Sequence, residues 1–454
     1  MIQSKNPTTE KVLKNFKEIS DKEMEKKISL AAEAFQFWKK TSFEERATLM
    51  LKLGDYLRSH AEDFSKLQML EMGKTMKSGP IGIKKCALLC DYYADNAENI
   101  LKNEILQTDH KEQYVKFDPL GIVLAIMPWN FPFWQVYRFA VPALMAGNVG
   151  LLKHASNVPQ CAQEIEKSFL ASGFPRGVFE NLFLSPGRVE GLIRDNRIAA
   201  VTLTGSEKAG SEVARIAGEE IKKVVLELGG SDPFIVFADA DIFEAAKLAV
   251  LSRLQGNVGQ SCISAKRFII EESIKEKFTK LVVEEFKKLS IGDPADPKTD
   301  IGPLATEQIL LDVEKQVKKS VEFGAKIVYG GARRAGEGYF YLPTVLTNIK
   351  KGMPVVDEEV FGPVLPIIYF KTEMEAIQIA NDTRYGLGAS IFTKDIEKAK
   401  RLISQIEAGS VCVNDMVKSD PRAPFGGVKK SGYGRELGAY GIKEFVNIKN
   451  VWFG

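Results

Sequence analysis

Histidine is scarce in this sequence, since the 454 residues contain only three. None of them belongs to an HExxH motif, and no two cysteines have the CxxC spacing of structural zinc sites, so the sequence predicts no metal site. The cysteines number five, an odd count without a regular framework, which argues against a disulfide scaffold. Free thiols persist in a reducing compartment, and we therefore expect a cytoplasmic protein.

Long apolar runs and a strong charge of either sign are also missing. The apolar run 121–127 is far shorter than the roughly 18 residues that a membrane-spanning helix needs, and the opening residues are polar rather than signal-like. Lys and Arg number 62 against 59 Asp and Glu, a net charge of +3, which does not support a nucleic-acid-binding surface. With 45% hydrophobic and 27% charged residues, the chain is expected to be globular, without a membrane or nucleic-acid partner.

The order of the predicted elements indicates an α/β fold. Segments with apolar residues at helical spacing come first, at 21–39, 43–72 and 80–101. Strand-like apolar runs then alternate with helical patterns, and this alternation implies parallel sheets covered by helices. Because the alternation restarts after residue 232, the sequence predicts two doubly wound domains and a final extension rich in glycine and charge.

Familiar nucleotide-binding motifs are absent. GKT at 73–75 resembles the end of a phosphate-binding P-loop, but Gln68 occupies the place of the required earlier glycine, and no strand leads into the motif. No GxGxxG follows a strand either. Motif rules alone therefore predict no nucleotide cofactor.

Three residues at strand ends or turns are candidates for catalysis. Cys262 lies among small and polar residues, where a helix N-terminus or backbone N–H groups can lower the pKa of a thiol. Glu227 ends an apolar strand, where a partly desolvated carboxylate can act as a general base. Asn130, stiffened by Pro128 and Pro132, can donate to a developing oxyanion. Each also has a structural interpretation: an inert buried thiol, a carboxylate paired at the sheet end, and aromatic packing around the asparagine.

Several motifs occur in a fixed order along nearly the whole chain. They are PWNFP (128–132), LLKHAS (151–156), TGSEKAG (204–210), LELGG (226–230), GQSC (259–262), EEVFGP (358–363) and PFGGVKKSG (424–432). Together they resemble the aldehyde dehydrogenase superfamily. The resemblance implies a Rossmann-like cofactor domain without the GxGxxG fingerprint, a catalytic domain, and a β-arm for oligomerisation.

The resemblance also implies domain boundaries. The NAD(P)-binding domain would comprise 1–104 and 121–230, and the catalytic domain with the nucleophilic cysteine would comprise 231–419. The arm would comprise 105–120 and 420–454. Family members assemble through such an arm, so the resemblance implies a homodimer or a homotetramer.

In the family, the cysteine matching Cys262 attacks the aldehyde as a thiolate, and the residue matching Asn130 helps to hold the oxyanion. Hydride leaves to the nicotinamide, and the glutamate matching Glu227 activates the water that hydrolyses the thioester. Ser264 stands where some relatives carry a second cysteine, so no disulfide with Cys262 is expected. A non-catalytic protein on this scaffold is the remaining alternative, and it would be marked by loss of the cysteine or the glutamate.

The implied cofactor contacts include one informative departure. Lys153 matches the lysine that binds the adenosine ribose, and Ser156 stands where NAD-preferring members often carry a glutamate. A carboxylate would repel a 2′-phosphate whereas a hydroxyl can donate to it, so we expect NADP to be preferred, with NAD accepted more weakly. The other implied cofactor contacts are Trp129, Gly205, Ser206, Glu359 and Phe361.

KHA (153–155) after a predicted strand and SDPFIV (231–236) after LELGG are finer features. They resemble the short bacterial succinate-semialdehyde dehydrogenases, which implies oxidation of succinate semialdehyde to the carboxylate. In such enzymes an arginine after PWNFP binds the substrate carboxylate, and Arg138 stands there, while Ser419 matches a second contact. Two positions depart from the pattern: Gly256 replaces an arginine of some relatives, and Phe139 replaces a lysine near the active site. The open alternatives are an interface salt bridge for Arg138 and another substrate, either glutarate semialdehyde or an aliphatic aldehyde.

Overall fold

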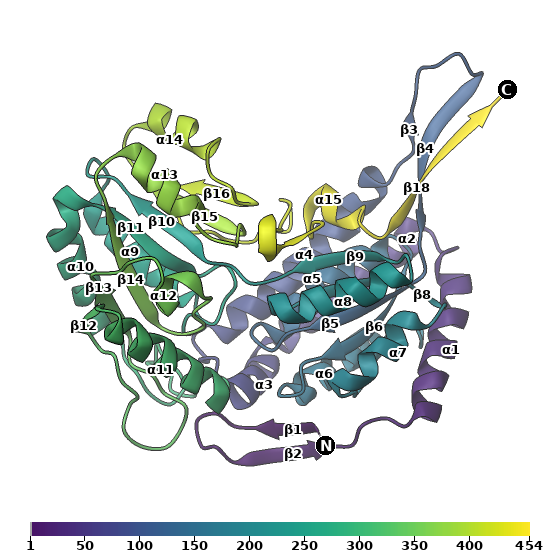
Figure 1. The fold of residues 1–454 in the computed structure, drawn as a ribbon. Coiled ribbons are helices and arrows are strands. Elements are labelled where there is room, and N and C mark those ends of the chain that lie inside the picture. Colours follow the sequence, from purple (N-terminus) through teal and green to yellow (C-terminus); the bar gives the residue numbers. More distant parts are fainter. Residues whose placement is uncertain (1) are drawn as a thin grey trace.

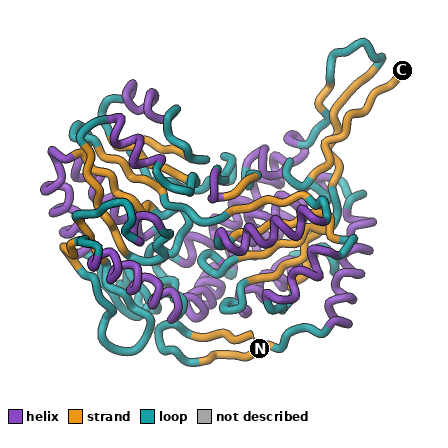
Figure 2. The backbone as a smooth tube through the Cα atoms, viewed as in Figure 1, coloured by secondary structure: helices purple, strands orange, loops and turns teal. Residues whose placement is uncertain are grey.

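The computed structural model describes residues 2–454 and shows two α/β lobes side by side, with an arm of strands projecting from one of them (Figure 1). We call the lobe with the six-stranded sheet the first lobe and the lobe with the seven-stranded sheet the second lobe. In both lobes helices enclose the strands (Figure 2). The predicted α/β class with two separate, mostly parallel sheets is confirmed.

The first-lobe sheet has the strand order β17-β9-β8-β5-β6-β7. Its strands are β5 (Ile122–Met127), β6 (Val149–His154), β7 (Phe179–Asn181), β8 (Ile198–Thr204), β9 (Lys223–Glu227) and β17 (Gly432–Tyr433). The strands from β9 to β7 run parallel, and β17 is antiparallel to β9. β5 and β6 are largely apolar and almost entirely buried, as expected of central strands covered on both faces.

The helices of the first lobe begin and end at recognisable signals. They are α1 (Asp21–Trp38), α2 (Phe43–Ser59), α3 (Ala61–Met72), α4 (Gly79–Ile100), α5 (Pro132–Met145), α6 (Pro159–Ala171), α7 (Val189–Arg194) and α8 (Glu207–Glu219). Ser20 and Ser42 form capping boxes with the glutamates three residues later, which satisfy N–H groups that the first turn leaves free. The predicted helical segment 43–72 is two helices, because His60 leaves helical geometry between them with φ −106° and ψ 16°.

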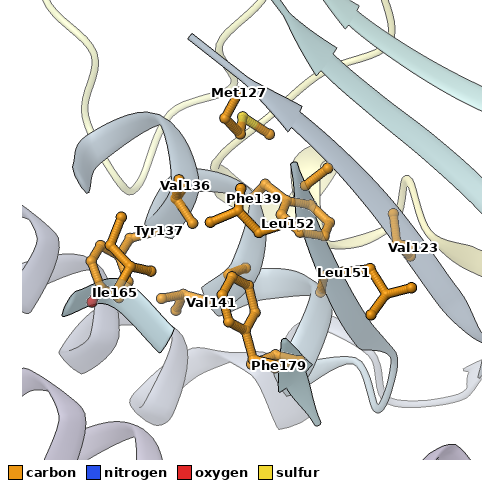
Figure 3. Close-up of a cluster of buried hydrophobic side chains, with 14 of the residues drawn as sticks. Val123, Met127, Val136, Tyr137, Phe139, Val141, Leu151, Leu152, Ile165 and Phe179 are labelled. Atoms are coloured by element: carbon orange, nitrogen blue, oxygen red, sulfur yellow. The ribbon is translucent and has the colours of Figure 1, made fainter. Parts of the chain in front are cut away.

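The core of the first lobe forms where α5 packs against β5 and β6 (Figure 3). Phe139 of α5 is 2% exposed and meets Phe445 edge to face, with ring centroids 5.9 Å apart. Burying such a side chain stabilises a fold by about 1.5–3 kcal/mol. Phe139 therefore serves the core, and a cation at the active site has to come from another residue.

The second-lobe sheet has the strand order β12-β13-β14-β11-β10-β15-β16, and β12 is its antiparallel strand. Its strands are β10 (Asp232–Val236), β11 (Ala265–Glu271), β12 (Lys326–Tyr329), β13 (Thr344–Thr347), β14 (Val364–Phe370), β15 (Gly388–Phe392) and β16 (Ser410–Val413). Its helices are α9 (Ile242–Leu254), α10 (Lys275–Lys287), α11 (Glu307–Glu322), α12 (Pro354–Asp357), α13 (Glu373–Asn381) and α14 (Ile396–Ile403). The loop between α9 and β11 carries Cys262.

An N-terminal hairpin, β1 (Ile2–Lys5) and β2 (Val12–Phe16), touches both lobes along their lower side (Figure 1). Gln160 of the first lobe donates to Ser4, at 3.0 Å, and the Tyr339 amide of the second lobe donates to the Pro7 carbonyl, also at 3.0 Å. The sequence analysis predicted no strands here. The hairpin adds a link between the lobes in addition to the covalent connection between β9 and β10.

The arm consists of β3 (Glu104–Ile105), β4 (Glu112–Pro119) and β18 (Val446–Phe453), and it extends away from the body of the molecule (Figure 1). β18 pairs antiparallel with β4 along its whole length. The segment before it forms β17 and α15 (Gly438–Ile442), and β17 belongs to the first-lobe sheet rather than to the arm. The residue boundaries proposed for the domains remain predictions. Among residues 2–454, no helix is both long and apolar enough to cross a bilayer.

Candidate active site between the two lobes

The Cys262 side chain borders two cavities. One has a volume of about 260 Å³, and we call it the lysine cavity. Its polar lining includes Lys74, Lys85, Gln135, Arg138, Lys418 and Ser419. The other has a volume of about 280 Å³, and we call it the strand-end cavity, because its lining includes residues 128–130, 204–206 and 228–229. Cavities of this size suit small ligands or parts of larger ones. A group in either cavity would lie beside the thiol.

The loop that carries Cys262 depends on glycine. Gly259 has φ +78°, and a Cβ atom there would lie 2.4 Å from the Gly362 carbonyl oxygen. Such contact is far inside van der Waals distance, and the left-handed conformation is itself unfavourable for other residues. Glycine is therefore required at position 259 by the close approach of the Gly362 backbone.

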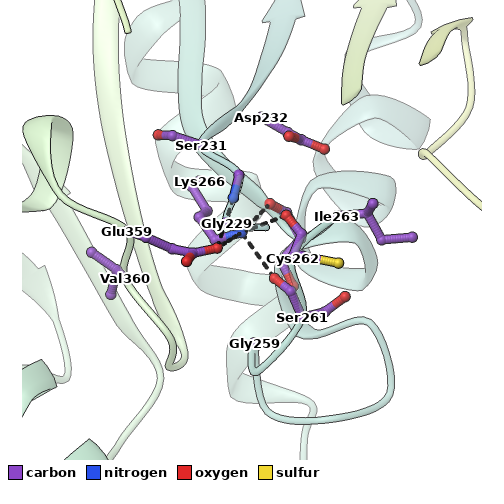
Figure 4. Close-up of polar contacts among 12 residues, drawn as sticks. Gly229, Ser231, Asp232, Gly259, Ser261, Cys262, Ile263, Lys266, Glu359 and Val360 are labelled. Carbon is purple, nitrogen blue, oxygen red and sulfur yellow. Dashed lines mark hydrogen bonds and ion pairs between the residues drawn. The ribbon is translucent and has the colours of Figure 1, made fainter. Parts of the chain in front are cut away.

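Buried cations also hold this loop (Figure 4). The Lys266 ammonium, 1% exposed, donates to the carbonyl oxygens of Ser261 and Cys262, both at 2.8 Å, and to that of Ser264 at 3.3 Å. Arg253 donates to the Gly259 carbonyl at 2.8 Å. Lys266 also forms an ion pair with Glu359 at 3.4 Å, so the thiol loop and this carboxylate share one cation.

The surroundings of Cys262 disfavour its thiolate. Desolvation raises the pKa of the thiol to about 12, although the charges of Arg138 and Lys266 act to lower it. The sequence analysis named groups that can lower the pKa of such a thiol, but here the pKa is raised because desolvation outweighs the neighbouring cations. In this state the thiol is protonated at neutral pH, and it becomes a nucleophile only when its proton leaves.

Asn130 lies beside the thiol loop, just after β5. Its side-chain nitrogen donates to the Gln260 carbonyl at 3.2 Å, and Asn257 donates to the Asn130 carbonyl at 2.7 Å. Asn130 and Cys262 both line the strand-end cavity. The amide is thus held rigidly near the sulfur, as a donor to an oxyanion requires.

Glu227 ends β9 and is 2% exposed. Neither of its carboxylate oxygens has a hydrogen-bond partner within residues 2–454. Burial, followed by the nearby charge of Glu436, raises the pKa of Glu227 well above its usual value. A buried carboxyl without partners is costly when it is charged, so this environment favours the protonated form of Glu227, which can act as a base once it has released that proton.

Arg138 points from α5 toward the lysine cavity, but its charge is already matched. It forms an ion pair with Glu436, and both side chains are almost fully buried. Its guanidinium also lies 4.5 Å from the centre of the Phe425 ring. The sequence analysis treated Arg138 as a carboxylate clamp, with a salt bridge between subunits as the alternative. The structure shows a salt bridge, and its partner is in the same chain.

The strand-end cavity brings together most of the residues expected to bind a cofactor. Five of them line it: Trp129, Gly205, Ser206, Glu359 and Phe361. Ser206 is the N-cap of α8, whose N-terminus favours an anion, and a Cβ atom at Gly205 would meet no atom closer than 3.5 Å. Open backbone at a helix N-terminus fits a pyrophosphate.

Lys153 and Ser156 do not line this cavity. Lys153 lies near the end of β6, and Ser156 follows that strand. Because β6, β5 and β8 are parallel neighbours, their carboxyl ends share one edge of the sheet, where ligands of such folds bind. Burial lowers the pKa of Lys153 from its usual value.

Several residues of the site were missed by sequence reasoning. Lys85 donates to the Ser419 hydroxyl at 2.6 Å, and Glu436 pairs with Arg138, yet both pairs join segments distant in the sequence. Lys74 belongs to the GKT motif that we rejected as a P-loop, and it was not considered further. Within residues 2–454, no group of three or more His, Cys, Asp or Glu could hold a metal ion.

Known proteins resemble the chain along its whole length. The model of the aldehyde dehydrogenase family matches residues 1–451. A probable succinate-semialdehyde dehydrogenase of Synechocystis, named for NADP(+), is 49% identical over 447 residues, which cover 98% of each chain. An NADP(+) succinate-semialdehyde dehydrogenase of Mycobacterium tuberculosis is 49% identical over 450 residues, again 98% of each chain. The crystal structure of succinic semialdehyde dehydrogenase from Streptococcus pyogenes with NADP+ has a TM-score of 0.98 at 38% identity and covers 100% of both chains. The chain therefore belongs to the aldehyde dehydrogenase family.

Proposed function

We propose that this aldehyde dehydrogenase oxidises succinate semialdehyde to succinate with NADP+. The observation that carries the proposal is the charge of the lysine cavity. Four basic residues line it beside Cys262, namely Lys74, Lys85, Arg138 and Lys418, and within residues 2–454 no Asp or Glu lines it. A short aldehyde with a carboxylate at its other end fits such a cavity, and the curated relatives are named for this substrate.

The proposed chemistry uses the residues around the thiol. The Cys262 thiol gives its proton to solvent and its sulfur bonds to the aldehyde carbon, while Asn130 and the Cys262 N–H donate to the oxygen that becomes negative. NADP+, when bound, accepts the hydride that leaves this carbon. The remaining thioester is attacked by water, one proton of which passes to Glu227. The carbon–sulfur bond then breaks to give the Cys262 thiolate and the carboxylic acid, which loses its proton to solvent and leaves as the carboxylate.

The cofactor preference rests on two side chains after β6. Ser156 can donate to a 2′-phosphate, and Lys153 supplies positive charge nearby. The proposed contacts to the rest of the cofactor are the five residues of the strand-end cavity. NAD, which lacks the 2′-phosphate, would lose the contact to Ser156 and bind more weakly.

We also propose that the chain forms a homodimer or homotetramer through its arm. Apolar side chains of the arm are exposed, including Ile105 (65%), Ile448 (61%) and Trp452 (56%). Exposed apolar side chains that gather on one element mark an interaction surface. All five cysteines of the chain are free thiols, which fits the proposed cytoplasmic location.

Initial rates with succinate semialdehyde, glutarate semialdehyde and butyraldehyde test the substrate. A charge-assisted contact to the carboxylate is worth about 1.5–3 kcal/mol, so kcat/KM for succinate semialdehyde should exceed that for butyraldehyde by about 10- to 100-fold. Absorbance of the reduced cofactor provides the measurement. A higher kcat/KM for butyraldehyde or for glutarate semialdehyde would contradict the proposed substrate.

Initial rates with NADP and with NAD at matched concentrations test the proposed cofactor preference. The wild-type enzyme should prefer NADP, and Ser156→Glu should reverse the preference, because the new carboxylate repels a 2′-phosphate and accepts from a 2′-hydroxyl. Ser156→Ala is the control: it removes the hydroxyl without adding charge, so it should weaken the preference without reversing it. A wild-type enzyme that favours NAD would disprove the assignment.

The raised pKa of Cys262 predicts how the free enzyme reacts with iodoacetamide. Below a pKa of about 12 the thiolate fraction increases roughly tenfold per pH unit, so alkylation should keep accelerating between about pH 7 and 10. Peptide mass spectrometry would follow Cys262 separately from the other cysteines, with Cys262→Ser as the blank. A plateau below about pH 8.5, the usual pKa of a cysteine, would show that the thiolate is stabilised instead.

Light scattering tests the arm. A double variant, Ile448→Glu with Trp452→Glu, should lower the molar mass of the particle in solution, because it places charges in an apolar interface. Met374→Glu is the matched control, since Met374 is 70% exposed on α13, outside the arm. An unchanged mass for the arm variant would place the subunit contact elsewhere.

A further inference from the structure

We propose that Lys85, assisted by Ser419, is the residue that binds the carboxylate of the substrate and so determines specificity for acidic aldehydes. This inference rests on the proposed function. It gives the main role in carboxylate binding to Lys85 rather than to Arg138.

Helix α4 turns Lys85 toward the cavity. Its buried side includes Ile83, Cys86 and Cys90, while the adjacent Lys84 is exposed to solvent. Lys85 is only partly exposed and lines the same cavity as Cys262. Adjacent residues on a helix point about 100° apart, which explains how one lysine reaches the cavity and its neighbour does not.

The basic residues of the cavity differ in whether their charge is matched. Arg138 is paired with Glu436, and Lys418 donates to both carboxylate oxygens of Asp415, at 2.8 and 3.0 Å. Within residues 2–454, Lys85 has no ion-pair partner, and its hydrogen bond goes to the neutral Ser419 hydroxyl at 2.6 Å. Asp420 lies beyond ion-pair distance and acts on Lys85 only through its charge. A buried cation without a direct ion-pair partner is a ready site for an anion.

The Lys85 ammonium is held in place before any ligand arrives. It lies 4.2 Å from the centre of the Trp134 ring, a favourable cation–π distance. Ser419 accepts from the lysine, and its own O–H stays available to donate to a carboxylate oxygen. The two groups therefore form a pair of donors, one charged and one neutral, that an incoming carboxylate can bridge.

Lys74 is the other cation of this cavity without an ion-pair partner among residues 2–454. It lies 4.2 Å from the centre of the Phe131 ring. Unlike Lys85, it forms no hydrogen bond to a hydroxyl group within residues 2–454, so no second donor is already held against its ammonium. Burial lowers the pKa of both lysines to about 8, and the charge of Arg138 adds to this effect at Lys85. A bound carboxylate would oppose that lowering, most strongly for the lysine that it contacts.

The separation of roles makes different predictions for Lys85 and Arg138. Removing Lys85 takes away a contact that only a carboxylated aldehyde makes. Removing Arg138 leaves Glu436 buried without its partner next to Glu227, which disturbs the catalytic residues whatever the aldehyde. The ratio of kcat/KM for succinate semialdehyde to kcat/KM for butyraldehyde distinguishes the two substitutions.

The test measures this ratio for the full-length enzyme and its variants. Lys85→Met should lower the ratio by about 10- to 100-fold, and Lys85→Arg should recover a large part of it, because a charged donor is restored. Lys84→Met is the matched control, since it removes an exposed lysine from the same helix, and its ratio should equal that of the wild type. Arg138→Met should lower both kcat/KM values together.

The outcomes separate the inference from the proposed function. A wild-type ratio near one would contradict the proposed function itself. Two results would overturn only the role of Lys85 while the wild-type ratio is high. In one, Lys85→Met keeps the ratio within about threefold of the wild type. In the other, Lys74→Met lowers the ratio further than Lys85→Met does. If circular dichroism shows that Lys85→Met does not fold, Lys85→Gln replaces it, and succinate is tested as an inhibitor of the wild type and of Lys85→Gln. The inhibition constant for succinate should be about tenfold or more higher for Lys85→Gln than for the wild type. An equal constant would refute the contact.

Discussion

A single buried ammonium group organises the reactive loop. Lys266 donates to carbonyl oxygens of the turn that carries Cys262 and forms an ion pair with Glu359, which lines the strand-end cavity. Without it these carbonyls would lose their cationic partner in a region closed to water, and each such loss costs about 1–3 kcal/mol. The positions of the Cys262 sulfur and of the Glu359 carboxylate therefore depend on the same cation. These contacts of Lys266 hold the thiol turn and Glu359 in fixed positions on either side of one ammonium group.

Desolvation then sets the protonation states around that turn. It raises the pKa of Cys262 and of Glu227 and lowers the pKa of Lys74 and Lys85, so the site as described carries less charge than its composition suggests. A carboxylated aldehyde and an anionic cofactor bring the missing negative charge with them. The binding of these ligands and the ionisation of the enzyme's own groups are consequently linked.

The sequence predicted the parts of the fold and site that are local. The apolar run 121–127 is β5 at Ile122–Met127, and the motif residues Asn130 and Cys262 do lie together. Contacts between distant segments had no sequence signal: Lys85 and Ser419 are 334 positions apart. Lys266 had no sequence signal, because a lysine beside an apolar strand is usually exposed to solvent. Only the fold shows to which carbonyl oxygens its ammonium donates. The helix break at His60 was missed because no Gly or Pro marks it. The strands β1 and β2 were missed because they are only four and five residues long, although Asn6-Pro7 marks a turn between them.

The C-terminal segment contributes to the lysine cavity, to a buried ion pair, to the first-lobe sheet and to the arm. It supplies Ser419 to the lysine cavity, Phe425 and Glu436 to Arg138, β17 to the first-lobe sheet, and finally β18 to the arm. One stretch of backbone thus contributes to aldehyde binding, to the ion pair beside Glu227 and to the exposed apolar strand of the arm. A proteolytic cut just before Ser419 would sever the covalent link of all of them to the rest of the chain at once, leaving strand pairing and the Arg138–Glu436 ion pair to hold them in place.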